Sequence, residues 1–300
     1  MKKFVFTVFI LVSFSAFSQK SFEFEGKYID PGSKERFNIQ VPYENDQTTS
    51  IPVTVIHGKE DGPVLGITAG VHGSEYVPIV AAQEFANKID PNQISGTIIV
   101  VNITNLASFL ERSVRVNPID RKNINRIFPG NMEGSVAEKI AAIISSKIIA
   151  RSDYFLDLHA GDTNNDLIAY AGYYNYGYQK EVSKKSFELA KALGFDIIVQ
   201  FGNKYKIEDK STYCSREAYM RGIPAADIEC GRRGIIEPRE VERVKFALFN
   251  VLKHLKMATG EPFYPKENLI VNERKSVNSQ NDGFFHSHIK PGQYIKKGMK

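Results

Sequence analysis

A histidine and a glutamate stand three residues apart in the segment Gly70-Val71-His72-Gly73-Ser74-Glu75. An apolar run at 64–69 precedes the segment and a stretch with helical spacing of apolar residues follows it. Open α/β sheets place binding sites in such loops, and glycine lets the backbone turn tightly enough for an imidazole and a carboxylate to face one point. The pair is a candidate metal site, although a histidine and a glutamate at this spacing also recur by chance.

A second histidine closes another apolar run, in Asp157-Leu158-His159-Ala160-Gly161. Because the carboxyl ends of parallel strands meet at one edge of a sheet, His159 is expected beside His72 and Glu75. Two histidines and a glutamate with an open fourth position form a catalytic zinc set. Without His72 and Glu75 nearby, His159 would be interpreted as a structural histidine that is hydrogen-bonded at the end of a strand, and not as a metal ligand. Asp157 either orients a ligating imidazole or faces solvent.

A glutamate ends the last apolar run, in Ile228-Glu229-Cys230-Gly231. A carboxylate at this place suits the base that zinc hydrolysis needs, although a glutamate at a strand end is more often merely exposed.

A loop rich in arginine contains the motif Asn123-Ile124-Asn125-Arg126-Ile127-Phe128-Pro129-Gly130, which follows Arg112, Arg115 and Arg121. Arginine binds carboxylates bidentately, whereas the alternative is a surface loop with solvated arginines.

Strands and helices alternate around these residues. Apolar runs predict buried strands at 64–69, 97–101, 154–158, 196–200 and 225–228, and helical spacing predicts helices at 77–89, 135–150, 179–193, 211–221 and 238–255. The pattern indicates an α/β fold with a mixed, largely parallel sheet covered by helices on both faces. Short strands are expected over 21–55.

The chain is expected to divide near residue 262, where Gly260 and Pro262 end the last helix. Residues 19–262 would form the catalytic domain with an N-terminal β segment, and 263–300 a small, incomplete C-terminal β-domain. Residues 1–18 are interpreted as a signal peptide, with Lys2 and Lys3, an apolar stretch at 4–12 and a small-x-small cleavage pattern before Gln19. We therefore expect a periplasmic or secreted protein that does not insert into the membrane after cleavage.

The composition of the chain excludes several classes of protein. Of the 300 residues, 42% are hydrophobic and 24% charged, which is typical of a globular protein. The net charge of +5 is dispersed and predicts no nucleic-acid partner. Two cysteines, Cys214 and Cys230, exclude a disulfide framework and leave open one bridge.

Together the motifs resemble the succinylglutamate desuccinylase/aspartoacylase family of the zinc carboxypeptidase superfamily. The resemblance runs from Phe37 to Gly234, with His72-Gly73-Ser74-Glu75 similar to the family's His-Gly-x-Glu. The segment 123–130 is similar to its Asn-Leu-Asn-Arg-x-Phe-Pro-Gly, 157–159 to its Asp-Leu-His and 229–231 to its Glu-x-Gly. Residues 283–298 are similar to the first hairpins of its C-terminal β-domain.

The resemblance implies specific roles. One zinc ion would be held by His72, Glu75 and His159, with Glu229 as general base and proton shuttle. Asn125 and Arg126 would bind a substrate carboxylate. Arg115 is similar to the family arginine that polarises the scissile carbonyl, and Arg112 and Arg121 are the alternative candidates for this role.

The resulting hypothesis is a zinc-dependent hydrolase that cleaves an amide or ester bond of a small carboxylate-bearing substrate, such as an N-acyl amino acid. A zinc carboxypeptidase acting on peptides or cell-wall peptides is one alternative. A noncatalytic zinc-binding protein is another, although such a protein has no need of a base at Glu229. The sequence indicates neither the acyl group nor the oligomeric state.

Overall fold

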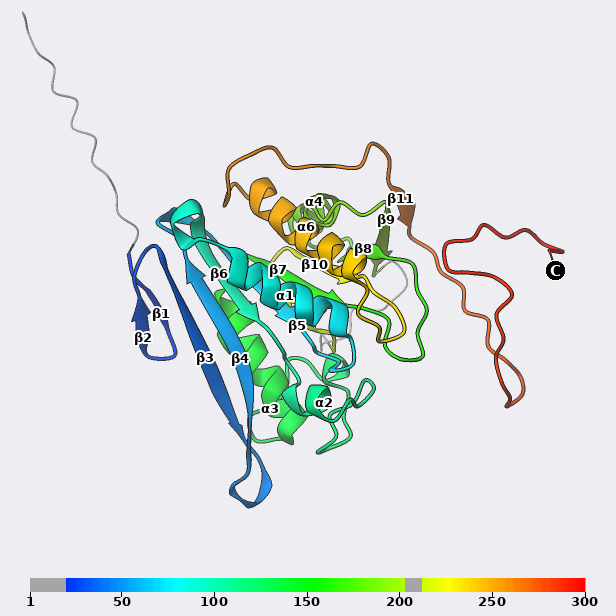
Figure 1. The fold of residues 1–300 in the computed structure, drawn as a ribbon, viewed down its shortest axis with the longest axis horizontal. Helices are drawn as coiled ribbons and strands as arrows, with labels where there is room; N and C mark the ends of the chain where they lie inside the picture. Colours follow the sequence, from blue (N-terminus) through cyan, green and yellow to red (C-terminus); the bar gives the residue numbers. More distant parts are fainter. Residues whose placement is uncertain (1–19, 203–211, 300) are drawn as a thin grey trace, which may run out of the picture.

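Apolar runs of strand length assemble into one nine-stranded sheet in the computed structural model, which describes residues 20–202 and 212–299 (Figure 1). The proposed signal peptide lies outside these residues. From one edge to the other, the strands are β11 (Leu269–Val271), β9 (Ile197–Phe201), β8 (Tyr170–Tyr174), β10 (Ala225–Glu229), β7 (Tyr154–His159), β5 (Glu60–Ala69), β6 (Ser95–Val101), β4 (Thr48–His57) and β3 (Ser33–Pro42). A separate hairpin pairs β1 (Phe22–Phe24) with β2 (Lys27–Ile29).

The centre of the sheet is parallel. Strands β10, β7, β5 and β6 pair in parallel, as do β8 with β9 and β9 with β11. The antiparallel pairs are β8 with β10, β6 with β4 and β4 with β3. The expected fold class is therefore confirmed. Strand β8 is absent from the sequence prediction because its tyrosine-rich segment is not a plain aliphatic run.

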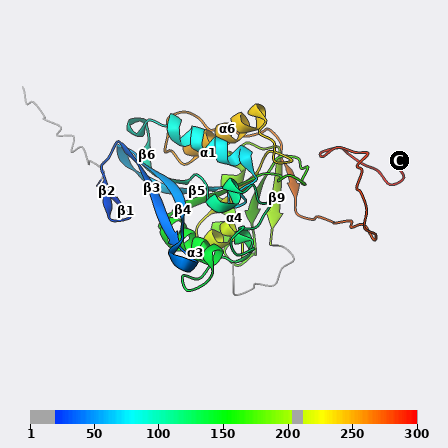
Figure 2. The ribbon, with the colours of Figure 1, turned by 60° about the horizontal axis from the view of Figure 1, so that its bottom comes forward.

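Helices cover both faces of the sheet, as the alternating pattern predicts (Figure 2). One face packs against α1 (Tyr76–Lys88), α4 (Lys180–Ala192) and α6 (Pro238–His254). The other packs against α3 (Val136–Ile143), which continues as a π-helical turn at Ile144–Ile148, and against α5 (Cys214–Met220). The short helix α2 is Leu106–Leu110.

Side chains alternate between the two faces of the sheet along each strand, so one strand contributes to the hydrophobic cores on both faces. In β6, Ile98 and Val100 belong to the cluster under α1 and α6, whereas Ile99 and Val101 belong to the cluster under α3. A strand whose two faces are both buried reads as a continuous apolar run, which is why these strands are visible in the sequence.

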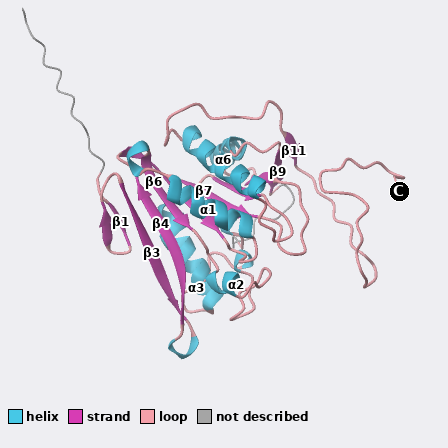
Figure 3. Cartoon of the chain, in the orientation of Figure 1, coloured by secondary structure: helices cyan, strands magenta, loops and turns pink. Residues whose placement is uncertain are grey.

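The N-terminal strands are longer than the short ones expected. Strands β3 and β4 have ten residues each and pair along their whole length at the sheet's edge (Figure 3). They carry buried side chains such as Val41 and Val53, which pack against the core on the α3 face.

The C-terminal segment contributes one strand to the main sheet. Strand β11 pairs with β9, and within 272–299 the structure has turns and extended chain without a strand. This segment extends away from the sheet (Figure 1), and it exposes Val277, Phe284 and Phe285 almost fully. The division near residue 262 stays a prediction.

Two further expectations concern single features. The bridge that the sequence left open is not formed, because Cys214 and Cys230 are both free and buried. Within 20–202 and 212–299, no helix combines the length and apolarity that a membrane crossing requires.

Candidate metal centre and active site

The registers of three neighbouring strands place chemically active side chains in rows. Across β7, β10 and β8, His159 pairs with Glu229 and Glu229 pairs with Tyr170. Two residues earlier along β7 and β10, Asp157 pairs with Asp227. Adjacent strands lie about 4.8 Å apart, and residues two apart share a face. These side chains therefore gather on the face covered by α5, at the carboxyl end of β7 and β10.

The loop after β5 delivers the other two predicted ligands. Gly70 has a φ of 66°, a conformation that favours glycine. A Cβ at Gly73 would lie 2.1 Å from the backbone nitrogen of Phe109, so the close approach of α2 also requires glycine. The tight turn brings His72 and Glu75 up to the end of β7.

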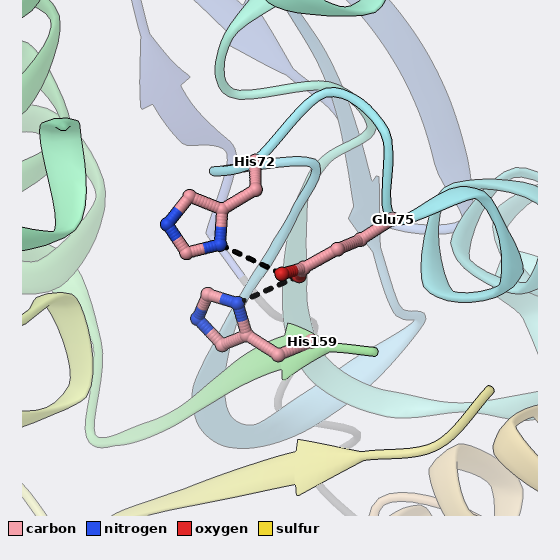
Figure 4. A group of neighbouring side chains, drawn as sticks. All are labelled: His72, Glu75 and His159. Atoms are coloured by element: carbon pink, nitrogen blue, oxygen red, sulfur yellow. Dashed lines mark hydrogen bonds and ion pairs between the residues drawn. The ribbon is translucent and has the colours of Figure 1, made fainter. Parts of the chain in front are cut away.

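His72, Glu75 and His159 form one compact cluster (Figure 4). The Glu75 carboxylate lies 2.7 Å from His72 Nδ1 through Oε1 and 2.9 Å from His159 Nδ1 through Oε2. One ligand atom from each residue lies within 4.8 Å of the others, and all three residues are buried. Two imidazoles and one carboxylate match the donor set of catalytic zinc sites, so these residues fit the metal that the sequence predicts.

Electrostatics within the cluster favour the proton on the His159 imidazole and the charge on the Glu75 carboxylate. Burial raises the pKa of Glu75, but His72 and His159 overcome this and lower it to about 2. Burial lowers the pKa of His159, whereas Asp157 and Glu75 raise it well above its usual value. A divalent cation would supply the positive charge in place of the His159 proton, so metal binding at this cluster should release a proton.

A second group of side chains orients the imidazoles. Asp157 is fully buried, and its Oδ2 lies 2.8 Å from His159 Nε2, while its Oδ1 accepts a hydrogen bond from the Thr68 hydroxyl at 2.7 Å. Asn123 Oδ1 lies 3.1 Å from His72 Nε2. The orienting contact expected of Asp157 is present, and Asn123 makes the equivalent contact for His72. The sequence motif contains Asn123 but does not reveal that contact.

A cavity of about 410 Å³ opens beside the cluster. Its lining residues are His72, Asn125, Arg126, His159, Tyr170, Tyr174, Tyr176, Phe201, Thr212, Tyr213, Ser215, Arg216, Asp227, Glu229 and Arg274. Burial raises the pKa of Glu229 to about 8, with His159 opposing the shift, and raises that of Asp227 to about 7. Glu229 therefore shares the cavity with two of the three candidate ligands, as expected, and has a pKa suited to proton transfer near neutral pH.

Asn125 and Arg126 also line this cavity, which brings both predicted substrate residues to the site. Asn125 Oδ1 accepts a hydrogen bond from the backbone of Cys214 at 2.8 Å, and its Nδ2 lies 3.3 Å from His159 Nε2. The Arg126 guanidinium lies 4.7 Å from the centre of the Tyr213 ring and donates to the Asn125 carbonyl. Contacts with its own loop and with the start of α5 thus orient Arg126.

Arg115 lies elsewhere. It is not among the cavity's lining residues, and its Nε donates to Asp162 Oδ2 at 2.8 Å with about half of the side chain exposed. The structure therefore gives no contact through which Arg115 would polarise a carbonyl, and that role stays a prediction.

The cavity residues that sequence reasoning missed include Tyr170, Arg216 and Arg274. Tyr170 reaches the site because antiparallel β8 lies next to β10, and Arg274 because β11 adds to the sheet's edge. Neither strand pairing has a local sequence signal. Arg216 follows Cys214 in α5, and only its helical position reveals its direction.

The fold and this site together define the class of carboxypeptidase-like hydrolases that act on amide bonds. Residues 61–255 match the model of the succinylglutamate desuccinylase/aspartoacylase catalytic domain, and the chain belongs to this family. The resemblance inferred from the motifs is confirmed.

Three relatives illustrate the similarity. The chain is 28% identical over 269 residues to an N-alpha-acetyl-L-2,4-diaminobutyric acid deacetylase from Halomonas elongata, covering 87% of this chain and 77% of that protein. A succinylglutamate desuccinylase structure from Silicibacter sp. TM1040 is 26% identical with a TM-score of 0.79, covering 88% of this chain and 80% of the other. The product-bound ectoine utilization protein EutE from Ruegeria pomeroyi is 27% identical with a TM-score of 0.73, covering 82% and 74%.

Proposed function

We propose that this protein is a zinc-dependent deacylase that hydrolyses the amide bond of a small N-acyl amino acid. One observation carries the proposal: the cluster of His72, Glu75 and His159 borders the same cavity as Glu229, a carboxyl group whose pKa is raised to about 8. The name of the Halomonas elongata relative, a deacetylase of an N-acetylated amino acid, supports this substrate class.

In this mechanism, His72, Glu75 and His159 would hold the zinc ion, which when bound supplies a Lewis acid that polarises a carbonyl and activates water. The Glu229 carboxylate accepts the proton of the attacking water. It then returns that proton to the leaving nitrogen, which becomes a free amine. A pKa near neutrality suits both steps, because the same group must take up and release a proton in one turnover.

Positioning comes from two further residues that line the cavity, Asn125 and Arg126. Arg126 binds the carboxylate of the amino-acid part, and Asn125 stands between Arg126 and His159. Holding the substrate at its carboxylate places the amide near the metal cluster, and such orientation lowers the entropic part of the barrier. The volume of about 410 Å³ suits a small substrate.

The proposal is tested by measuring bound metal and by assaying the zinc-loaded protein on N-acyl amino acids and short peptides. Glu229→Gln should lower kcat by about 10²- to 10⁴-fold while leaving zinc bound. Glu267→Gln, at an exposed position outside the lining of the cavity, is the matched control and should keep full activity. A Glu229→Gln variant with full activity would refute the assigned base.

The same panel separates the alternatives. Hydrolysis of C-terminal peptide bonds in preference to N-acyl amino acids would identify a carboxypeptidase, and bound zinc without any hydrolysis would identify a noncatalytic protein. We also propose that the protein is exported to the periplasm or secreted, on the strength of residues 1–18 alone. N-terminal sequencing of the exported protein should begin near residue 19.

A further inference from the structure

Two loops leave the sheet next to each other at the candidate site. The loop after β7 begins beside His159, and the loop after β10 begins beside Glu229. Strands β7 and β10 are parallel neighbours, and His159 lies opposite Glu229 in their register. The contacts between these two loops therefore bear on how the candidate metal ligand and the candidate base face each other.

Backbone hydrogen bonds join the two loops beyond the strand ends. Each loop both donates to the other and accepts from it, so the pairing of β7 with β10 continues after the last strand residues. The bonds run from Cys230 N to His159 O at 3.0 Å, and at 2.9 Å from Gly161 N to Gly231 O, from Gly234 N to Gly161 O and from Arg233 N to Asn165 O.

One carboxylate adds charged contacts to this joint. Asp166 lies in the loop after β7 and pairs with two consecutive arginines in the loop after β10, Arg232 and Arg233. Its Oδ1 lies 2.7 Å from Arg232 Nε, and its Oδ2 accepts hydrogen bonds from Arg232 Nη2 at 3.0 Å and from the Arg233 guanidinium. The Asp166 side chain is only 22% exposed, so water screens these ion pairs less than it screens pairs at the open surface.

The loop after β10 needs such support, because its backbone conformation is unusual. Arg233 has a φ of 57°, in the left-handed region that favours glycine, and Gly231 and Gly234 have φ values of 105° and 59°. A residue other than glycine stays in this region only where its surroundings hold it there. The contacts of Arg233 with Asn165 and Asp166 hold it.

These three charged residues do not line the cavity that contains Glu229. Asp166, Arg232 and Arg233 instead line a second, more open pocket, which shares Tyr170 with that cavity. Two roles are therefore open to the arginines: they bind part of a substrate, or they act through the position of Glu229. The ion pairs favour the second role, because Asp166 already engages both guanidinium groups.

We propose that Asp166 is a positioning residue. Through Arg232 and Arg233 it fixes the loop after β10 to the loop after β7, and so it holds Glu229 at its working position relative to His159. This inference rests on the proposed function and adds to it a residue that acts on the base without touching the substrate. A misplacement of about 1 Å can cost about 100-fold in rate, so even a partial loosening of this joint should be visible in kcat.

Steady-state kinetics of the zinc-loaded full chain on N-acetyl amino acids should compare wild type with Asp166→Asn, which keeps the shape of the side chain and removes its charge. We expect kcat to fall about 10-fold, while KM stays within about twofold and zinc affinity within about threefold of wild type. Asp166→Glu should restore most of kcat, because it returns a carboxylate to the two arginines. Arg232→Gln should lower kcat by a similar factor, and the double variant should be no slower than Asp166→Asn, because both changes break one joint.

Hydrogen exchange gives a readout that does not depend on activity. Measured by mass spectrometry, the amides of residues 159–166 and 229–236 should exchange about 10-fold faster in Asp166→Asn than in wild type and regain protection in Asp166→Glu. Glu84→Gln is the matched control, because it breaks an ion pair of 2.6 Å with Lys245 that joins α1 to α6. It should leave kcat and the exchange of both segments unchanged.

Each outcome decides the proposal. An unchanged kcat in Asp166→Asn would overturn it, as would a loss that appears mainly in KM, because the arginines would then contact the substrate. Additive losses in the double variant, or equal effects in Glu84→Gln, would overturn it as well. If Asp166→Asn does not fold, Arg232→Gln is judged by the same criteria.

The failure of the proposed function is a separate result. A wild-type protein that hydrolyses no N-acyl amino acid would refute that function, and the exchange measurement would still test the joint. Faster exchange of both segments in Asp166→Asn would then show that Asp166 fixes the two loops, and unchanged exchange would overturn the assignment.

Discussion

Replacing Asp157 by asparagine should weaken zinc binding about 10- to 100-fold without unfolding the protein. Asp157 is fully buried, and its two oxygens contact Thr68 at 2.7 Å and His159 Nε2 at 2.8 Å. The carboxylate favours a proton on Nε2, which leaves Nδ1, the nitrogen facing Glu75, as the metal-binding atom. An asparagine that keeps its oxygen on Thr68 turns an amide N–H toward Nε2 and favours the opposite tautomer.

The magnitude follows from the bond that is lost. A hydrogen bond to a charged group contributes about 1.5–3 kcal/mol, and each 1.4 kcal/mol corresponds to a factor of ten in affinity. One such bond therefore accounts for about 10- to 100-fold, which agrees with the usual effect of removing a residue that orients a metal ligand. The volume of the side chain is nearly unchanged, so no cavity term is added.

The assay is competition for zinc against a chromophoric chelator, with thermal unfolding of the chelator-treated protein as the measure of folding. Asp153→Asn is the matched control, because Asp153 precedes the same strand and its side chain accepts a hydrogen bond from the backbone of Val64 at 2.8 Å instead of contacting a histidine. It should bind zinc as the wild type does. Zinc affinity of Asp157→Asn within threefold of wild type would refute the reasoning, as would an equal loss in the control.

Three further predictions concern folding and reactivity. Cys214 and Cys230 should react with a thiol reagent at pH 8 far more slowly in the native protein than in denaturant, because burial raises the pKa of both thiols. Gly73→Ala should lower both the melting temperature and zinc affinity, measured by calorimetry, because its Cβ would meet a backbone nitrogen at 2.1 Å. Glu138→Gln should reduce stability to urea by about 1 kcal/mol at pH 7, because a glutamine can keep the capping box of α3 but loses the ion pair with Lys122. The Glu138 pKa is lowered to about 2 by these contacts, so its contribution is full above about pH 4.5 and should fade as the pH falls toward 2.

These predictions have their own controls. Gly283→Ala, where an added Cβ meets nothing within 4 Å, should leave zinc binding and melting temperature unchanged. Rapid labelling of both thiols in the native protein would contradict their burial. A stability difference between Glu138→Gln and wild type that stayed constant from pH 7 to pH 2.5 would show that the carboxylate charge plays no part.

Much of the site can be predicted from the sequence, because its residues belong to short motifs of adjacent positions. His72 and Glu75 lie on one tight turn, and His159 and Glu229 each end an apolar run, so their common edge follows from the parallel pairing of buried strands. The helices α1, α4 and α6 also follow from apolar spacing, because each buries one face against the sheet.

Other features of the site have no local signal in the sequence. Arg115 has neighbours in the same arginine-rich loop, and nothing in their spacing says which guanidinium faces the cavity; in the structure Arg115 pairs with Asp162, and its role stays a prediction. Tyr170 and Arg274 reach the site only through strand pairings between segments about 50 residues or more apart in sequence.

The sequence by itself therefore determined the class of fold, the family and the candidate donor set of the metal, since periodicity and short motifs are properties of adjacent residues. Only the tertiary structure decided which side chains share the cavity with Glu229 and how Arg126 stacks on the Tyr213 ring. The physical reason is that register and strand order arise from packing across the whole sheet, and no segment contains that information alone.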